Sequence, residues 1–185
     1  MTNRKHHDPA EFIDRAMHAF WAGGFDGTSI GDLVAATGVN RGSIYASFDG
    51  KRDLFTATLH RYDDLHRARF LERLRRQHPA REAVLAAFTV AASTPQGDTP
   101  AGCLLVNTAV ELAPHDVEIA ALIGQSLSKV ETFFQDCLTE AGHPAPEPTA
   151  KALLALFLGL RVLTRAQAPR TTRDAIVDQA KAMMD

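Results

Sequence analysis

The chain has few cysteines and no long uninterrupted apolar stretch. Only Cys103 and Cys137 occur among the 185 residues, so we expect no disulfide framework and a reducing, cytoplasmic location. The longest apolar run covers residues 152–160, and its nine residues are about half of the ~18–20 that span a bilayer. We therefore expect a buried helix there. The amino terminus also lacks the apolar segment of a signal peptide.

Patterns that accompany catalysis or metal binding are missing as well. The sequence contains no Cys-x-x-Cys or His-Glu-x-x-His spacing, no Gly-x-Ser-x-Gly, no phosphate-binding glycine loop and no dinucleotide fingerprint, which are the usual signatures of such sites. We expect no enzyme, no metal site and no cofactor.

Positive charge is not in excess either. The net charge is −2, and residues 1–55 hold six Lys and Arg against seven Asp and Glu. A protein that binds nucleic acid through a basic patch would show the opposite balance. Any contact with DNA must therefore depend on individually placed side chains.

Helical periodicity dominates the whole chain, and no strand pattern competes with it. The predicted fold is all-α, with about nine helices. In the first half, helices are expected over residues 9–23, 29–37, 40–48 and 51–77. In the second half, they are expected over residues 80–93, 100–112, 116–140, 149–168 and 172–184, with a loop at 94–100 and a linker at 143–148.

Residues 24–55 predict two short helices joined by a tight turn and followed by a long helix. Gly38 can adopt the positive φ that the turn requires, and Asn40 is a good N-cap for the second helix. The apolar positions that can form a small core are Ile30, Leu33, Val34, Val39, Ile44 and Phe48. This arrangement is typical of a helix-turn-helix, whose second helix enters the major groove of DNA.

The polar outer face of that second helix suits DNA. Arg41 can reach a base edge, and Arg to guanine is the commonest specific contact. Gly42 allows close approach of the backbone, and hydroxyl and ammonium groups nearby suit phosphate oxygens. The predicted DNA-binding residues are Thr28, Asn40, Arg41, Gly42, Ser43, Tyr45, Ala46, Ser47 and Lys51. A helix-turn-helix used only for contacts within or between proteins is the alternative.

Residues 9–56 resemble the DNA-binding domain of the TetR family of transcriptional regulators. Val34 and Thr37 depart from its pattern, because alanine is more frequent at both positions. The matching positions are Gly24-Phe25, Thr28-Ser29-Ile30, Asp32-Leu33, Gly38-Val39, Gly42, Ile44-Tyr45, Phe48, Lys51 and Leu54-Phe55.

The resemblance implies a DNA-binding domain over residues 1–55 and an all-helical domain for effector binding and dimerisation over residues 56–185. It further implies a homodimer, favoured as a repressor, that binds palindromic operator DNA and is released by a small-molecule effector.

The apolar helix around residues 151–165 predicts a dimer interface. A helix that is apolar around its whole circumference must be buried on all sides, and a partner copy can cover one side. The predicted interface residues are Leu153, Leu156, Phe157, Leu160 and Leu163. The alternative is the central helix of a monomeric bundle.

An effector site is predicted around polar residues of the helix after residue 100. Cys103, Asn107 and Glu111 recur at a spacing of four residues, on one helix face. We expect them to line a cavity together with Phe133, Phe134, Phe157 or Arg161. Alternatively, Asn107 and Glu111 brace neighbouring helix ends.

Cys103 has two interpretations. It lies in the first turn of its predicted helix, where backbone amides favour a reactive thiolate, and the Gly-Cys start resembles that of TetR-family regulators that sense electrophiles or oxidants. The other interpretation, a small buried apolar residue, is how free cysteine usually behaves. A helical small-molecule-binding protein that no longer reads DNA is a further hypothesis, supported by the near-neutral charge of residues 1–55.

Overall fold

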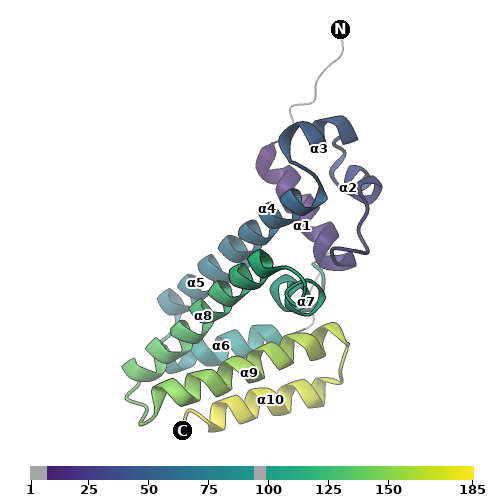
Figure 1. The fold of residues 1–185 in the computed structure, drawn as a ribbon. Coiled ribbons are helices and arrows are strands. Elements are labelled where there is room, and N and C mark those ends of the chain that lie inside the picture. The colour runs from purple at the N-terminus through teal and green to yellow at the C-terminus, as the bar shows by residue number, and fades with distance from the viewer. Residues whose placement is uncertain (1–7, 94–98) are drawn as a thin grey trace.

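Helices make up all the regular structure in the computed structural model, which describes residues 8–93 and 99–185 (Figure 1). The first half contains α1 (Pro9–Gly23), α2 (Ile30–Thr37), α3 (Arg41–Ser47), α4 (Lys51–Tyr62), the π-helical segment η1 (Asp63–Ala68) and α5 (Arg69–Gln77). The second half contains α6 (Ala80–Ala92), α7 (Leu104–Glu111), α8 (Val117–Glu140), α9 (Pro146–Arg165) and α10 (Arg170–Ala182). The all-α prediction is confirmed. The loop predicted at residues 94–100 lies mostly outside the described residues.

The long helix predicted over residues 51–77 is continuous but not uniform. Tyr62, Asp63, Ala68 and Arg69 all keep right-handed helical angles, so α4, η1 and α5 follow one another without a break. Within η1 the hydrogen bonds lengthen by one residue, and the Arg69 N–H donates to the Asp64 carbonyl. If α4, η1 and α5 are counted as one helix, the described residues contain nine helices, as the sequence predicts.

Two helix starts differ from the prediction. α7 begins at Leu104 rather than near residue 100, because Gly102 adopts φ +87° and Cys103 is extended. Gly102 passes so close to α9 that an added Cβ would lie 2.9 Å from the Arg165 Cβ, so only glycine fits. α9 begins at Pro146 rather than at residue 149, because proline is well suited to a first helical position.

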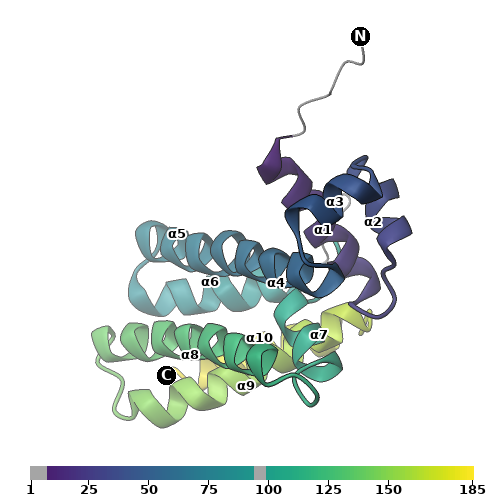
Figure 2. The same ribbon diagram turned by 45° about the horizontal axis from the view of Figure 1, so that its top comes forward.

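The helices enclose two apolar cores. α1, α2 and α3 gather at one end of the molecule, and α6, α8, α9 and α10 pack at the other (Figures 1 and 2). The first core centres on Phe20, Leu33 and Phe55, and it also takes in Leu104 of α7 and Ile119 of α8. The boundary expected between residues 55 and 56 lies inside α4, so the first core extends past it.

The second core lies between α5, α6, α8, α9 and α10. Its centre is a group of phenylalanine rings, in which Phe88 lies 5.8 Å from Phe134 and 5.5 Å from Phe157 between ring centroids. Leu71 and Leu74 of α5 also belong to it. The helix over residues 51–77 therefore supplies buried side chains to both cores.

Candidate nucleic-acid interface and ligand cavity

Local hydrogen bonds fix the geometry of the α2-turn-α3 unit. Ser29 and Asp32 cap α2 reciprocally, since the Ser29 hydroxyl accepts from the Asp32 N–H and the Asp32 carboxylate accepts from the Ser29 N–H at 2.8 Å. Gly38 follows α2 with φ +72°, in the left-handed conformation expected of this turn. Asn40 then caps α3, because its side-chain oxygen accepts from the Ser43 N–H at 2.9 Å. The sequence predicted the turn at Gly38 and the cap at Asn40.

α3 buries one side chain and presents the others to solvent. Ile44 is 1% exposed and holds the helix against the first core, whereas Tyr45 is 53% exposed. Arg41 forms no ion pair or hydrogen bond with any described residue, so its guanidinium is available to a partner. The exposed residues of this face are Asn40, Arg41, Gly42, Ser43, Tyr45, Ala46 and Ser47, which we call the α3 face.

Two residues predicted to contact phosphate are placed differently. The Thr28 side chain is buried, and its hydroxyl donates to the Gly24 carbonyl at 2.7 Å, so it stabilises the turn after α1 rather than facing DNA. Lys51 donates to the Phe25 carbonyl at 3.0 Å and lies 4.2 Å above the Phe25 ring. The prediction is thus corrected for the Thr28 side chain, and the Lys51 ammonium must exchange its partner to reach a phosphate.

A cavity of about 370 Å³ lies where η1 meets α5, α6, α8 and α9. This volume is within the range of small-molecule sites, roughly 300–1,000 Å³. Most of its wall is apolar. The side chains that bear on its chemistry are Tyr62, His66, Phe70, Cys103, Phe157 and Arg161.

The polar part of the cavity centres on Arg161. The Arg161 guanidinium lies close to the Tyr62 hydroxyl and the Cys103 thiol. Burial lowers the pKa of Arg161, but these two neighbours raise it more, so the guanidinium stays charged. Burial raises the pKa of Tyr62 above its usual range, and the phenol therefore keeps its proton and can donate.

The residues predicted for the effector site separate into three groups. Cys103, Phe157 and Arg161 line the cavity. Phe133 and Phe134 lie in the second core. Asn107 and Glu111 line a different groove, between α7 and α9.

Glu111 braces the turn that follows α1, in agreement with the alternative interpretation that it braces a neighbouring helix end. Its carboxylate accepts hydrogen bonds from the Phe25 and Asp26 N–H groups at 3.0 and 2.9 Å. The placement of Glu111 in an effector cavity is therefore corrected, because its carboxylate binds the backbone of the turn after α1, outside the cavity.

Sequence reasoning missed Tyr62 and His66 as cavity residues. They lie four residues apart on the long helix, and their rings stack with centroids 4.9 Å apart. Trp21 of α1 packs edge-on against both, at 4.9 Å from Tyr62 and 5.2 Å from His66. The signal available in the sequence was an aromatic pair spaced four residues apart on one helix. Through Trp21, this pair brings the cavity wall into direct contact with α1.

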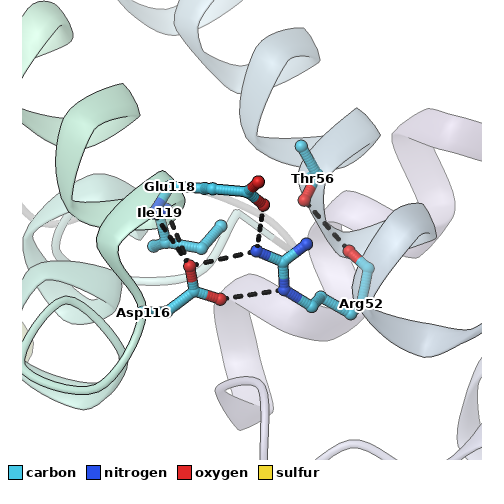
Figure 3. A network of polar contacts seen from close by, with 5 residues as sticks. All are labelled: Arg52, Thr56, Asp116, Glu118 and Ile119. Carbon is cyan, nitrogen blue, oxygen red and sulfur yellow. Dashed lines mark hydrogen bonds and ion pairs between the residues drawn. The ribbon is translucent and has the colours of Figure 1, made fainter.

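Two further polar contacts join the N-terminal part of the chain to α8 and α9. Arg52 of α4 donates to Asp116 at 2.8 and 3.0 Å and to Glu118 at 2.7 Å, at the start of α8 (Figure 3). Arg165 of α9 donates to the Trp21 carbonyl at 3.0 Å and to the Ala22 carbonyl at 3.2 Å, at the end of α1. Arg161 of the cavity lies one helical turn before Arg165.

The residues predicted for a dimer interface are only partly accessible. Leu153 and Leu160 are 0% exposed within the chain and belong to the second core, so a partner copy cannot contact them. Leu156, Phe157 and Leu163 are partly buried. The outer face of α9 carries instead Ala155, Gly159, Val162 and Ala166, all exposed. We call these four residues the α9 stripe.

No helix among the described residues is long and apolar enough to cross a membrane.

Comparison with known proteins identifies related sequences and folds. Residues 12–58 match the family model described as bacterial regulatory proteins, tetR family. The HTH-type transcriptional repressor ComR of Escherichia coli is 34% identical over 150 residues, which cover 79% of this chain and 71% of ComR. The HTH-type transcriptional regulator YezE of Bacillus subtilis is 30% identical over 178 residues, which cover 94% and 92%.

The fold also matches that of the TetR family transcriptional regulator CifR, solved as a cysteine mutant with a 26 bp operator DNA. The TM-score is 0.83 at 24% identity, covering 97% of this chain and 98% of CifR.

We predict that mild acid destabilises the protein through His66. Burial, followed by repulsion from His18 and Arg161, lowers the pKa of His66 below 6.5, although Asp14 opposes the shift. The unfolded imidazole therefore binds a proton at a higher pH than the folded one, and the free energy of unfolding falls as pH drops below about 6.5.

Urea unfolding between about pH 7.5 and 5 measures this loss. His66→Phe should flatten the slope over this window, whereas His60→Phe, at an exposed site of α4, should leave it unchanged. Equal slopes for wild type and His66→Phe would contradict the prediction.

Proposed function

This chain belongs to the TetR family of bacterial regulatory proteins, and from that membership we propose that it is a transcriptional repressor, not an enzyme. It binds palindromic operator DNA as a homodimer and releases it when a small molecule binds. The observation that supports this most directly is the α3 face, where Arg41 is exposed and unpaired among the described residues. DNA is its target, so we place its action in the cytoplasm.

In this proposal α3 lies in the major groove. Arg41 at the first turn reads a base edge, while Ser43, Tyr45 and Ser47 contact phosphates or neighbouring bases. The near-neutral charge of residues 1–55 gives little general affinity for polyanions. Binding therefore requires two α3 faces that engage half-sites about one helical turn apart.

We place the dimer contact on the α9 stripe. Ala155, Gly159, Val162 and Ala166 recur at intervals of three or four residues, which brings them onto one side of α9. Val162 is 50% exposed, and an added Cβ at Gly159 would meet no atom within 4 Å inside the chain. A flat stripe of small residues allows two helices to approach closely.

Release follows from the position of the cavity. A ligand there contacts Tyr62 and His66, which pack on Trp21 of α1, and Arg161, which precedes the Arg165 contact to the end of α1. Ligand binding then favours a conformation in which α1 and the attached α3 are displaced, so the two α3 faces no longer match the half-sites.

Cys103 supports a second mode of release. It lies on the cavity wall beside Arg161, where it can add as a thiolate to an activated C=C bond. The thiol proton passes to solvent, the C–S bond forms as the C=C π bond breaks, and the neighbouring carbon takes a proton from solvent. The other cysteine, Cys137, is 0% exposed, and burial raises the pKa of its thiol, which keeps it unreactive.

The substitution Arg41→Ala should weaken binding to a duplex that the protein selects from a random-sequence pool by about 1–3 kcal/mol and relax the selected sequence. Fluorescence anisotropy measures both affinities. Arg170→Ala, an exposed arginine of α10, is the matched control and should bind as wild type. An equal loss on random DNA would assign Arg41 to phosphate alone, and failure to select any sequence would contradict the proposed function.

The variant Gly159→Arg should convert the dimer to a monomer. The side chain has room within one chain but blocks close approach of a second α9. Analytical ultracentrifugation measures the mass, and Ala175→Arg on the exposed face of α10 should remain dimeric. A dimeric Gly159→Arg protein would place the interface elsewhere.

The two modes of release differ in the variant Cys103→Ser. If thiol modification releases DNA, N-ethylmaleimide should dissociate the complex of the wild-type protein and of Cys137→Ser, but not that of Cys103→Ser. Anisotropy of labelled duplex gives the readout. Identical dissociation of wild type and Cys103→Ser would exclude sensing through Cys103.

A further inference from the structure

The charge of the cavity wall is entirely of one sign. Arg67, Arg73 and Arg161 line the cavity, and no Asp or Glu among the described residues does. In a chain with a net charge of −2, this is a local reversal of the overall balance.

The three arginines differ in how their charge is compensated. Arg67 forms a two-fold hydrogen-bonded ion pair with Asp63, and Lys129 joins that carboxylate at 3.6 Å. Arg73 is exposed to solvent and lies over the Phe70 ring, 5.6 Å from its centroid. Arg161 is partly buried, and no carboxylate in the described residues pairs with it.

Arg161 is therefore a partly buried cation of the cavity wall with no carboxylate partner among the described residues. Removing a guanidinium from water is costly unless an anion compensates it. Its neighbours inside the protein are the Tyr62 hydroxyl and the Cys103 side chain, and neither is a carboxylate. The Tyr62 hydroxyl keeps its proton and can donate to an incoming anion from the same side.

The rest of the wall suits an apolar body. Phe70, Phe157, Leu105 and Leu127 come from four different helices or their flanking turns and close around the cavity. Its volume of about 370 Å³ accommodates a ligand larger than an inorganic ion.

We propose that the cavity binds an organic monoanion, whose acidic group pairs with Arg161 and Tyr62 and whose hydrocarbon or aromatic body fills the apolar part. This proposal rests on the proposed function, because it identifies the monoanion with the effector that releases DNA. An Arg–carboxylate pair is bidentate and directional, so the acidic group fixes the ligand against α9, one turn from Arg165.

Ligands that differ only in charge test whether the cavity of the wild-type protein, without DNA, prefers an anion. The probes are 4-phenylbutyrate and decanoate, their neutral amides, and 4-phenylbutylamine. Trp21 is the only tryptophan of the chain and touches Tyr62 and His66 of the wall, so its fluorescence reports binding, and titration calorimetry gives the affinity. Each acid should bind about tenfold or more tightly than its amide, and the amine should bind least.

Substitutions in the cavity wall show which residue binds the acidic group of the ligand. Arg161→Gln should reduce the preference for acid over amide to about unity, and Arg161→Lys should keep part of it. Arg73→Gln, which removes a solvent-exposed cation at the same cavity, should keep most of it. Thermal melting checks that each variant is folded, and the comparison of acid with amide on the wild-type protein does not depend on any variant.

Equal binding of acid and amide, tighter binding of the amine, or no binding of either acid at millimolar concentration would overturn the inference. An acid that binds through Arg161 but leaves the complex with the selected duplex intact would uphold it, and would contradict only the proposed release. Failure of the protein to select DNA would likewise leave the binding result unaffected.

Discussion

The helix over residues 51–77 has to satisfy two hydrophobic cores at once, and the rest of the structure depends on this constraint. Leu54, Phe55 and Leu59 are buried in the first core, whereas Leu71 and Leu74 are buried in the second. Between them the helix widens into η1. A π-helical turn inserts one residue into the hydrogen-bonding pattern and so rotates the buried face of α5 relative to that of α4.

The cavity lies at this junction, because the side chains of η1 belong fully to neither core. Tyr62 and His66 face the cavity on one side and Trp21 of α1 on the other. Tyr62 and Trp21 also belong to the first core, so the cavity wall contacts the DNA-binding end directly. Shape changes in the cavity can therefore reach α1 through direct contact, and α1 holds α2 and α3 through their common core.

Polar contacts hold the DNA-binding end on the remaining helices. Arg52 with Asp116, Glu111 with the Phe25 and Asp26 N–H groups, and Arg165 with the end of α1 all bridge the two parts. The Arg52 side chain is half exposed to solvent, and exposed ion pairs contribute little to stability. These polar contacts instead fix the orientation of the DNA-binding end relative to the other helices. Because each contact is weak, a ligand can change that orientation at a small cost in free energy.

The sequence specified the DNA-binding end far better than the cavity. Caps and turns depend on neighbouring residues, so Gly38 and Asn40 could be assigned from local pattern alone. The exposed α3 face followed from the same local geometry. Thr28 and Lys51 were harder, because their partners Gly24 and Phe25 are set by how the chain folds back after α1.

The cavity depends on contacts between distant segments. Arg161 was among the candidates, but its neighbours Tyr62 and Cys103 precede it by 99 and 58 residues and share no local pattern with it. Leu153 and Leu160 were misassigned to the dimer contact for a similar reason: periodicity shows that a side is apolar, but not which helix covers it.

The central claim is that the cavity and the α3 face are coupled, and reciprocal binding tests it most directly. The measurement is the affinity of 4-phenylbutyrate for the free protein and for the protein saturated with its selected duplex. Coupling predicts weaker binding to the DNA complex, by the same factor by which the acid weakens DNA binding. Equal affinities in the two states would contradict the account.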